Sequence, residues 1–267
     1  MKFLVLFLVF VSVGFSSVIK SKLISVDLEQ SIATIEISKI DIGMSGFVSH
    51  KLSNNHSAIL NNVVVIDFDK EKHIATLKLS KFDDLVHTAL PQGKWKTRVG
   101  DTVTLAFGYT RGLLIAPSEE IYYYITRATS QMQWVHPDIF ATILSFQGHP
   151  TPLKDDFTRL SKATSVGLLF LYLNKYVFTI DIKSFVILNI SPAPLTQDNI
   201  ILPFYTRVEE IDASWWGEGS DELQAYEPYY FSLLVKYNQK NKELFKIIEE
   251  NGSDNIQYLL EKFNIKD

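Results

Sequence analysis

The feature that most constrains the fold is a long apolar stretch between positions 166 and 182, interrupted once. The segments VGLLFLYL and YVFTIDI flank the pair Asn174-Lys175, and a two-residue polar break between strand-like runs is typical of a tight β-hairpin. The first segment is apolar at nearly every position, which indicates a strand buried on both faces. We therefore expect residues 108–190 to form an α+β unit that contains this hairpin.

Three helices are expected between a strand ending at Ile115 and this hairpin. Pro117 suits the first turn of one helix, because a proline there loses no hydrogen bond. Pro137 begins the second helix and Gly148 ends it. Thr151 is expected to be the N-cap of the third.

The region before this unit reads as a series of short strands. Residues 74–79 alternate between polar and apolar side chains, the period expected of a sheet with one wet face. Strands are expected at Val18–Leu28, Ile32–Ile37, Gly46–Leu52, Ala58–Phe68, Ile74–Leu79 and Thr102–Phe107. Six strands at this spacing predict a small antiparallel β-barrel or sandwich. The fold class is therefore α+β: a barrel or sandwich, then an α+β unit, then a helical C-terminal tail.

The tail is expected to begin with a linker at Ser191-Pro192-Ala193-Pro194 and to continue with a strand at ILPFYTRVEEI. Two helices follow, at Gln239–Glu250 and Asp254–Phe263. The predicted layout is a leader at residues 1–16, a barrel-like domain at 17–107, an α+β domain at 108–190, and the tail at 191–267. Because no Pro/Ser-rich spacer separates Phe107 from Leu113, the second and third parts are expected to pack tightly together.

The N-terminus has the layout of a secretory signal peptide. Lys2 precedes an apolar run from Phe3 to Phe15, and small residues surround the expected cleavage point near Ser16. The run is shorter than the ~20 residues that cross a bilayer, and the mature chain has no segment of spanning length. We expect an exported protein, in the periplasm, at the outer membrane or on the cell surface.

Charge and composition exclude several classes of function. The chain has 26 basic and 30 acidic residues, which argues against nucleic-acid binding, because such binding depends on clustered lysine and arginine. Cysteine is absent, so thiol catalysis is excluded. No cofactor or metal is expected, since the six histidines form no pair with ligand spacing.

His136 and His149 each precede a proline at an expected helix start. They could form an acid–base pair, or their rings could cap backbone groups. The second interpretation is preferred, because no neighbouring residue supplies the third group that catalysis needs. No catalytic residue is assigned, and an enzyme is not expected.

The most unusual aromatic segment is Trp215-Trp216, followed by Tyr229 and Tyr230. These rings could anchor the tail against the α+β unit, which is the preferred interpretation. Alternatively, they could form an exposed binding surface, because aromatic residues are concentrated in interfaces.

Several motifs carry a resemblance to a known family. In order, they are LLIAP before a Tyr-rich helix, WVHPD-I-FA, GHPTP, VGLLF and D-x-KSF, followed by PFYTRVEEI. This series resembles the N-terminal domain of the plasminogen-binding proteins in the cell envelope of Campylobacter- and Helicobacter-type bacteria. The resemblance covers most of the mature chain.

The resemblance implies an envelope or surface protein whose partner is host plasminogen. Kringle modules of such partners recognise a lysine ammonium paired with a carboxylate. Lys242, Lys246 and Glu250 lie one turn apart on one helix face and could imitate that pair; Lys266 beside the chain-end carboxylate is a second candidate. Both could instead be ordinary solvated residues.

Two further possibilities stay open. The chain could be an envelope scaffolding or protein-interaction domain without catalytic activity, whose partner is another envelope protein. Separately, Glu249–Ser253 resembles the acceptor sequence for bacterial N-glycosylation in Campylobacter relatives, with Asn251 as the acceptor.

Overall fold

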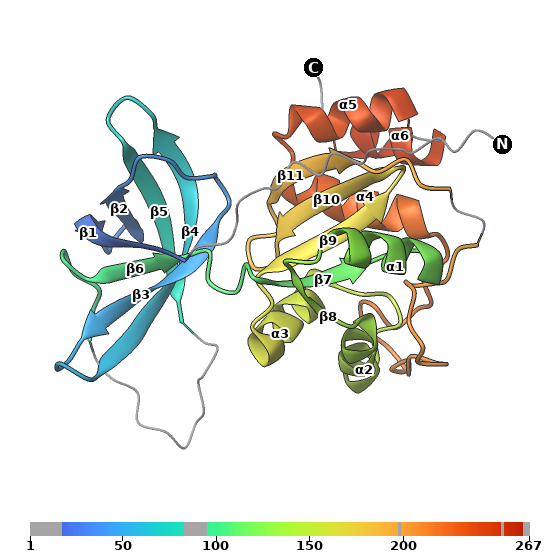
Figure 1. Cartoon of the computed structure of the whole chain (residues 1–267), viewed down its shortest axis with the longest axis horizontal. Coiled ribbons are helices and arrows are strands. Elements are labelled where there is room, and N and C mark those ends of the chain that lie inside the picture. The colour runs from blue at the N-terminus through green and yellow to red at the C-terminus, as the bar shows by residue number, and fades with distance from the viewer. Residues whose placement is uncertain (1–17, 83–94, 197–198, 252–253, 264–267) are drawn as a thin grey trace.

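The computed structural model describes residues 18–82, 95–196, 199–251 and 254–263. The expected leader at residues 1–16 lies outside them. Figure 1 shows two parts side by side: an all-β part at the N-terminus and a sheet with helices on both of its faces. The expected α+β class is confirmed.

The N-terminal part is a closed antiparallel barrel with the strand order β1-β2-β5-β4-β3-β6. Its strands are β1 (Ile19–Asp27), β2 (Ile32–Glu36), β3 (Ser45–Lys51), β4 (Ser57–Asp69), β5 (Ile74–Lys81) and β6 (Thr102–Leu105). Alternate apolar side chains fill the interior, among them Leu23, Val48 and Leu77. A barrel is therefore the correct alternative of the two, and its closure leaves no free sheet edge.

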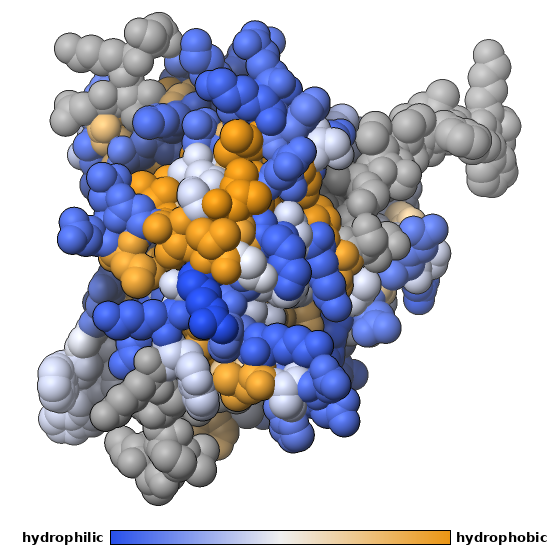
Figure 2. Space-filling model, turned by 90° about the vertical axis from the view of Figure 1, so that its left-hand side faces the viewer, coloured by the Kyte–Doolittle hydropathy of each residue, from blue (hydrophilic) through white to orange (hydrophobic). Residues whose placement is uncertain are grey.

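The outer surface of the barrel is partly apolar. Ile24 on β1 and Ile66 on β4 are each 45% exposed. Figure 2 views this end of the molecule and shows hydrophobic residues gathered in the middle of the face, with hydrophilic residues around them. The outward positions of these strands are therefore less polar than strict alternation would make them.

The second sheet has five strands in the order β11-β10-β9-β7-β8. They are β7 (Arg111–Ile115), β8 (Gln133–Val135), β9 (Leu168–Leu173), β10 (Tyr176–Asp181) and β11 (Ile187–Pro192). The strands β8, β7 and β9 run parallel, whereas β9, β10 and β11 are antiparallel neighbours. Asn174 and Lys175 form the predicted two-residue hairpin, with φ values of 45° and 66°.

The continuous apolar strand β9 is buried on both faces, as expected. Leu169 and Leu171 pack in one core with the helices α2 (Pro137–Gln147), α3 (Lys154–Thr164) and α4 (Tyr226–Tyr237). Leu168 and Phe170 pack in the other core, with α1 (Glu119–Ala128) and the barrel interior. Two C-terminal helices, α5 (Lys242–Asn251) and α6 (Asp254–Lys262), add to the first core next to α4.

The structure corrects two expected helix starts. The first helix begins at Glu119 after the N-cap Ser118, whose side chain accepts from the Ile121 N–H. The third helix has Leu153 as its N-cap, and the Asp156 carboxylate accepts from the Leu153 N–H at 2.9 Å. Thr151 is unavailable as a cap because its hydroxyl donates to the Asp221 carbonyl at 2.6 Å.

The tail also differs from expectation. The strand expected at residues 201–211 is absent: Ile201 N donates to Pro117 O and Tyr205 N to Ala116 O, a spacing that no sheet ladder has. The expected linker begins inside β11, because Ser191 and Pro192 pair with β10. Helix α4 was not foreseen in the sequence.

Candidate functional site

The motifs LLIAP, WVHPD and PFYTRVEEI meet at one edge of the second sheet. The parallel strands β7 and β8 end there at Ile115 and Val135, each followed directly by a proline-containing turn into a helix. The carboxyl ends of parallel strands are where α/β sheets ordinarily bind ligands. The polar groups at this edge are therefore the first candidates for a functional site.

Asp138, in the first turn of α2, holds the tail segment against this edge. One carboxylate oxygen accepts from the Thr206 hydroxyl and the Arg207 N–H, both at 2.9 Å, and the other accepts from the Arg207 guanidinium at 2.7 Å. Burial opposes ionisation of Asp138, but the hydrogen bonds from Arg207 and Thr206 outweigh it and lower the pKa. The Asp138 carboxylate thus joins the WVHPD motif to the PFYTRVEEI motif by hydrogen bonds and an ion pair.

His136 caps α2. Its Nδ1 accepts from the Asp138 N–H at 3.2 Å, so the preferred interpretation of a ring that caps backbone groups is confirmed for this residue. Its Nε2 is buried and has no hydrogen-bond partner among the described residues, and the Tyr122 ring lies 5.3 Å away in an edge-on arrangement. Burial lowers the His136 pKa. The imidazole is therefore held neutral more strongly than a free one.

Tyrosines complete this cluster. The Tyr205 hydroxyl donates to the Glu119 carboxylate at 3.1 Å, and the Tyr205 ring lies 5.4 Å from that of Tyr122. Burial raises the pKa of both tyrosines, that of Tyr122 to about 12. Neither tyrosine is therefore activated as a base, and the cluster has the character of a packed junction.

His149 has a different partner. Its Nδ1 lies 3.0 Å from the Asp156 carboxylate, which is completely buried. The His149 ring therefore pairs with Asp156, whereas the His136 ring lies against Asp138, whose backbone N–H it caps and whose carboxylate is 3.1 Å from Nδ1. The structure gives the two histidines separate partners, and no group of three potential metal ligands occurs in the described part of the chain.

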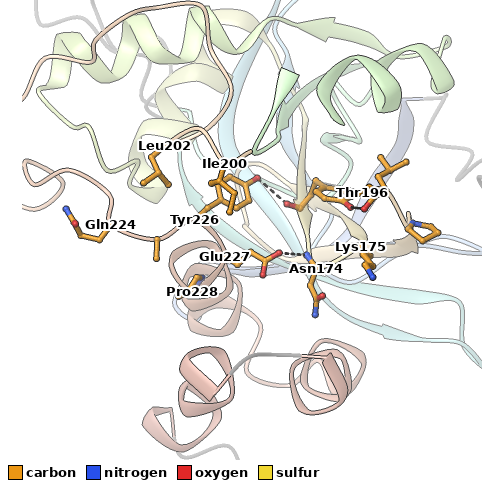
Figure 3. Close-up of a pocket in the computed structure, with 13 residues that line it drawn as sticks. Asn174, Lys175, Thr196, Ile200, Leu202, Gln224, Tyr226, Glu227 and Pro228 are labelled. Atoms are coloured by element: carbon orange, nitrogen blue, oxygen red, sulfur yellow. Dashed lines mark hydrogen bonds between the residues drawn. The ribbon is translucent and has the colours of Figure 1, made fainter. Parts of the chain in front are cut away.

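A cavity of about 770 Å³ lies further along the same edge, between the β9–β10 hairpin and the start of α4 (Figure 3). Lys175 and Glu227 supply its charged groups, and Ile200 and Leu202 part of its apolar wall. Glu227 accepts from the Asn174 N–H at 2.9 Å, so its carboxylate serves the hairpin. The lining offers a binding surface and no paired nucleophile and base.

The lysines of the expected plasminogen motif lie on the solvent face of α5. Lys242, Lys246 and Glu250 are all exposed, while Leu244 and Ile248 on the opposite face are buried. The Lys246 ammonium lies 3.7 Å from the Glu250 carboxylate. The helix thus presents two ammonium groups and a carboxylate outward. Lys266, the other candidate, lies outside the described residues.

The aromatic segment divides into two parts. Tyr230 is fully buried, and its hydroxyl donates to Pro203 O; the Tyr229 hydroxyl donates to Pro152 O. Trp215 and Trp216, in contrast, are 100% and 85% exposed. The tyrosines therefore anchor the tail, as preferred for the whole segment, whereas the tryptophans remain in solvent. Asn251, the expected glycosylation site, is the last residue of α5.

Sequence reasoning missed one polar cluster on the barrel. Arg98 donates to His50 Nε2 at 3.0 Å, and His50 Nδ1 lies 2.6 Å from Asp101. Because a guanidinium can only donate, Nε2 accepts and Nδ1 carries the proton given to Asp101. The sequence holds no local signal for this contact, since His50 and Asp101 are separated by 51 positions.

Within the residues that the structure describes, no helix is long and apolar enough to cross a membrane. Two kinds of comparison relate the chain to known proteins. A family model described as "Plasminogen-binding protein pgbA N-terminal" matches residues 18–234. No solved structure matches significantly.

Two proteins named "Plasminogen-binding protein PgbA", from two strains of Helicobacter pylori, are 29% and 28% identical to this chain over 224 residues. The matches cover 82% of this chain and 47% and 48% of the relatives, so the chain spans about half of their length. The family model matches well over half of the chain and includes each motif gathered at the sheet edge. The chain therefore belongs to the PgbA N-terminal family of plasminogen-binding proteins.

Proposed function

We propose that this chain is an exported envelope or surface protein that binds plasminogen through lysine-type recognition. The observation that carries the proposal is the outward-facing pair Lys246 and Glu250 on α5, with Lys242 one turn earlier. The names of its relatives and of its family support plasminogen as the partner.

The geometry suits such recognition. Residues four apart on a helix are separated by ~6 Å along its axis, so an ammonium and a carboxylate can reach one partner site together. The pair is an exposed one, and such pairs contribute only ~0.2–1 kcal/mol, so opening it for a partner costs little. A cation and an anion offered together match a partner that pairs each with an opposite charge.

The test is capture of plasminogen by the mature chain, with and without 6-aminohexanoate as a lysine analogue. Lys242→Ala/Lys246→Ala and Glu250→Ala should each weaken capture, and the analogue should compete. Lys70→Ala/Lys72→Ala, in the β4–β5 turn of the barrel, is the matched control, because it removes two exposed lysines beside an acidic partner, Asp69. A chain truncated before Lys266 separates the second candidate from the first.

Capture that persists through the α5 changes, the truncation and the analogue would contradict lysine-type recognition. N-terminal sequencing of the exported protein tests export separately, because a protein that began at Met1 would have kept its leader.

A second candidate is a protein-interaction or scaffolding role toward another envelope protein, without catalysis. The exposure of Trp215 and Trp216 favours it. If the wild-type chain did not capture plasminogen, this second function would be the better supported of the two.

A further inference from the structure

Residues 208–223, here called the tryptophan loop, keep two neighbouring indoles in solvent. Figure 1 shows this part of the chain, in orange, passing beside α2. Phe146, near the end of α2, is 84% exposed and lies between two residues that hold the loop, Ser145 and Gly148. Large aromatic side chains gathered in solvent are typical of an interaction surface, because folding otherwise removes them from water.

Hydrogen bonds hold the loop on both sides of the indoles. On one side, Asp212 N donates to the Ser145 hydroxyl at 3.1 Å and Ser214 N to Gly148 O at 2.9 Å. On the other side, Thr151 donates through its N–H to Gly219 O at 3.1 Å and through its hydroxyl to Asp221 O at 2.6 Å. The GHPTP turn thus fixes the loop, and a surface ordered in advance loses little conformational entropy on binding.

All the charged side chains of the tryptophan loop are acidic. Its acidic residues are Glu209, Glu210, Asp212, Glu218, Asp221 and Glu222, all exposed, and it contains no lysine or arginine. The nearest basic residue in the sequence, Arg207, is bound to Asp138. The exposed indoles therefore stand in a negative field.

We infer that the tryptophan loop is a docking surface for a basic polypeptide segment with closely spaced lysine or arginine side chains. Ammonium and guanidinium groups are attracted to indole faces and to the surrounding carboxylates. Their aliphatic stems can cover the apolar surface of Trp215, Trp216 and Phe146 while the charged ends stay in water. This inference is independent of plasminogen capture by α5.

The negative charge of the tryptophan loop argues against two other binding partners, a second copy of this chain and a lipid bilayer. A second copy would bring the same six carboxylates to the contact, and like charges repel. An anionic bilayer would be repelled in the same way. A zwitterionic bilayer would accept tryptophans at its interface but would gain nothing from the carboxylates around them.

The experiment measures fluorescence anisotropy of a labelled octapeptide of alternating arginine and glycine, titrated with the mature chain. An octapeptide of alternating glutamate and glycine is the peptide control. Three variants are compared with wild type: Trp215→Ser/Trp216→Ser, Glu218→Gln/Asp221→Asn/Glu222→Gln, and Trp95→Ser. Trp95 is a half-exposed tryptophan on the barrel side of the chain and serves as the matched control.

The arginine peptide should bind and the glutamate peptide should not. Loss of the two indoles should weaken binding about tenfold, and loss of the three carboxylates should weaken it and reduce its salt dependence. Trp95→Ser should leave binding unchanged. Circular dichroism of each variant should match wild type, because the substituted side chains lie in solvent.

Three results would overturn the inference. One is no arginine-peptide binding at protein concentrations up to about 1 mM, where even a weak interaction is detected. Another is an equal effect of Trp95→Ser and of the double tryptophan change. The third is co-sedimentation with phosphatidylcholine or phosphatidylglycerol vesicles that depends on Trp215 and Trp216, which would assign the loop to a membrane surface.

Discussion

Ser45 donates both its backbone N–H and its hydroxyl to one carboxylate oxygen of Asp181, at 3.0 and 2.6 Å. The two residues are 136 positions apart and join the barrel to the second sheet. Tyr109 donates to the same oxygen at 2.7 Å, and the other oxygen accepts from the Lys183 and Ser184 N–H groups. A fully buried carboxylate that accepts from five donors makes the junction specific, because buried polar groups must find hydrogen-bond partners to avoid a desolvation penalty.

Asp181→Asn is expected to lower the free energy of unfolding by about 2–4 kcal/mol, because the amide nitrogen cannot accept from donors that the carboxylate satisfied. Urea denaturation measures the change. Asp155→Asn, an exposed acid on α3, should stay within ~0.5 kcal/mol of wild type. Equal stabilities of the two variants would show that the Asp181 hydrogen bonds do not hold the junction.

The core that α2, α3 and α4 form on one face of the second sheet is expected to lose stability when its side chains are shortened. Phe140→Ala and Leu169→Ala should each cost about 2–5 kcal/mol, because both side chains are fully buried and a cavity would remain. The matched control is Phe146→Ala on the same helix as Phe140, whose exposed ring should contribute less than ~0.5 kcal/mol to stability. The measurement is thermal or urea unfolding. If Phe146→Ala lowered the free energy of unfolding as much as Phe140→Ala, the assignment of the buried face of α2 would be contradicted.

The sequence predicted the elements whose signals are local. The alternation of residues 74–79 placed β5, and Asn174-Lys175 placed the hairpin, because both patterns depend on neighbours in the chain. Helix α4 escaped prediction since its apolar and aromatic residues do not follow one helical face: Tyr230, Phe231, Leu233, Leu234 and Val235 are all buried. A helix enclosed on most sides lacks the amphipathic pattern that marks a surface helix.

The candidate site was predictable only in part, for a similar reason. The exposed face of α5 follows from helical spacing alone, as the positions of Lys242 and Lys246 show. The contact between Asp138 and Arg207 joins residues about 70 positions apart, and so does the hydrogen bond that holds the tryptophan loop on Thr151. Such contacts leave no trace in local spacing, so the exposure of Trp215 and the burial of Tyr230 required the tertiary structure.

Gly46 of β3 has no room for a side chain. A Cβ atom there would lie 2.1 Å from the backbone oxygen of Thr104 on the paired strand β6. Gly46→Ala should therefore force the two strands apart and cost more than ~3 kcal/mol, or prevent folding. Gly100→Ala is the control: its Cβ would meet no atom of the described residues within 4 Å, and its φ is +87°, so only left-handed strain of ~1 kcal/mol is expected. Circular dichroism and urea unfolding of both variants compare the two effects.

The cap at His136 should make stability depend on pH. Burial lowers the pKa of the folded imidazole, and the Arg207 charge adds to this effect while Asp138 opposes it. As the pH falls through the unfolded value of about 6.5, the unfolded chain binds a proton that the folded chain does not. The free energy of unfolding should therefore decrease from that pH down to the folded pKa.

His136→Asn should reduce this dependence, because an asparagine side chain can still accept from the Asp138 N–H as an N-cap and does not titrate. The measurement is urea unfolding at a series of pH values between about 5 and 7.5, on either side of the unfolded imidazole pKa. His56→Asn, which replaces an exposed histidine of the barrel, is the control and should keep the wild-type slope. If the curves of wild type and His136→Asn ran parallel over this range, the His136 imidazole would not be the group that makes stability depend on pH.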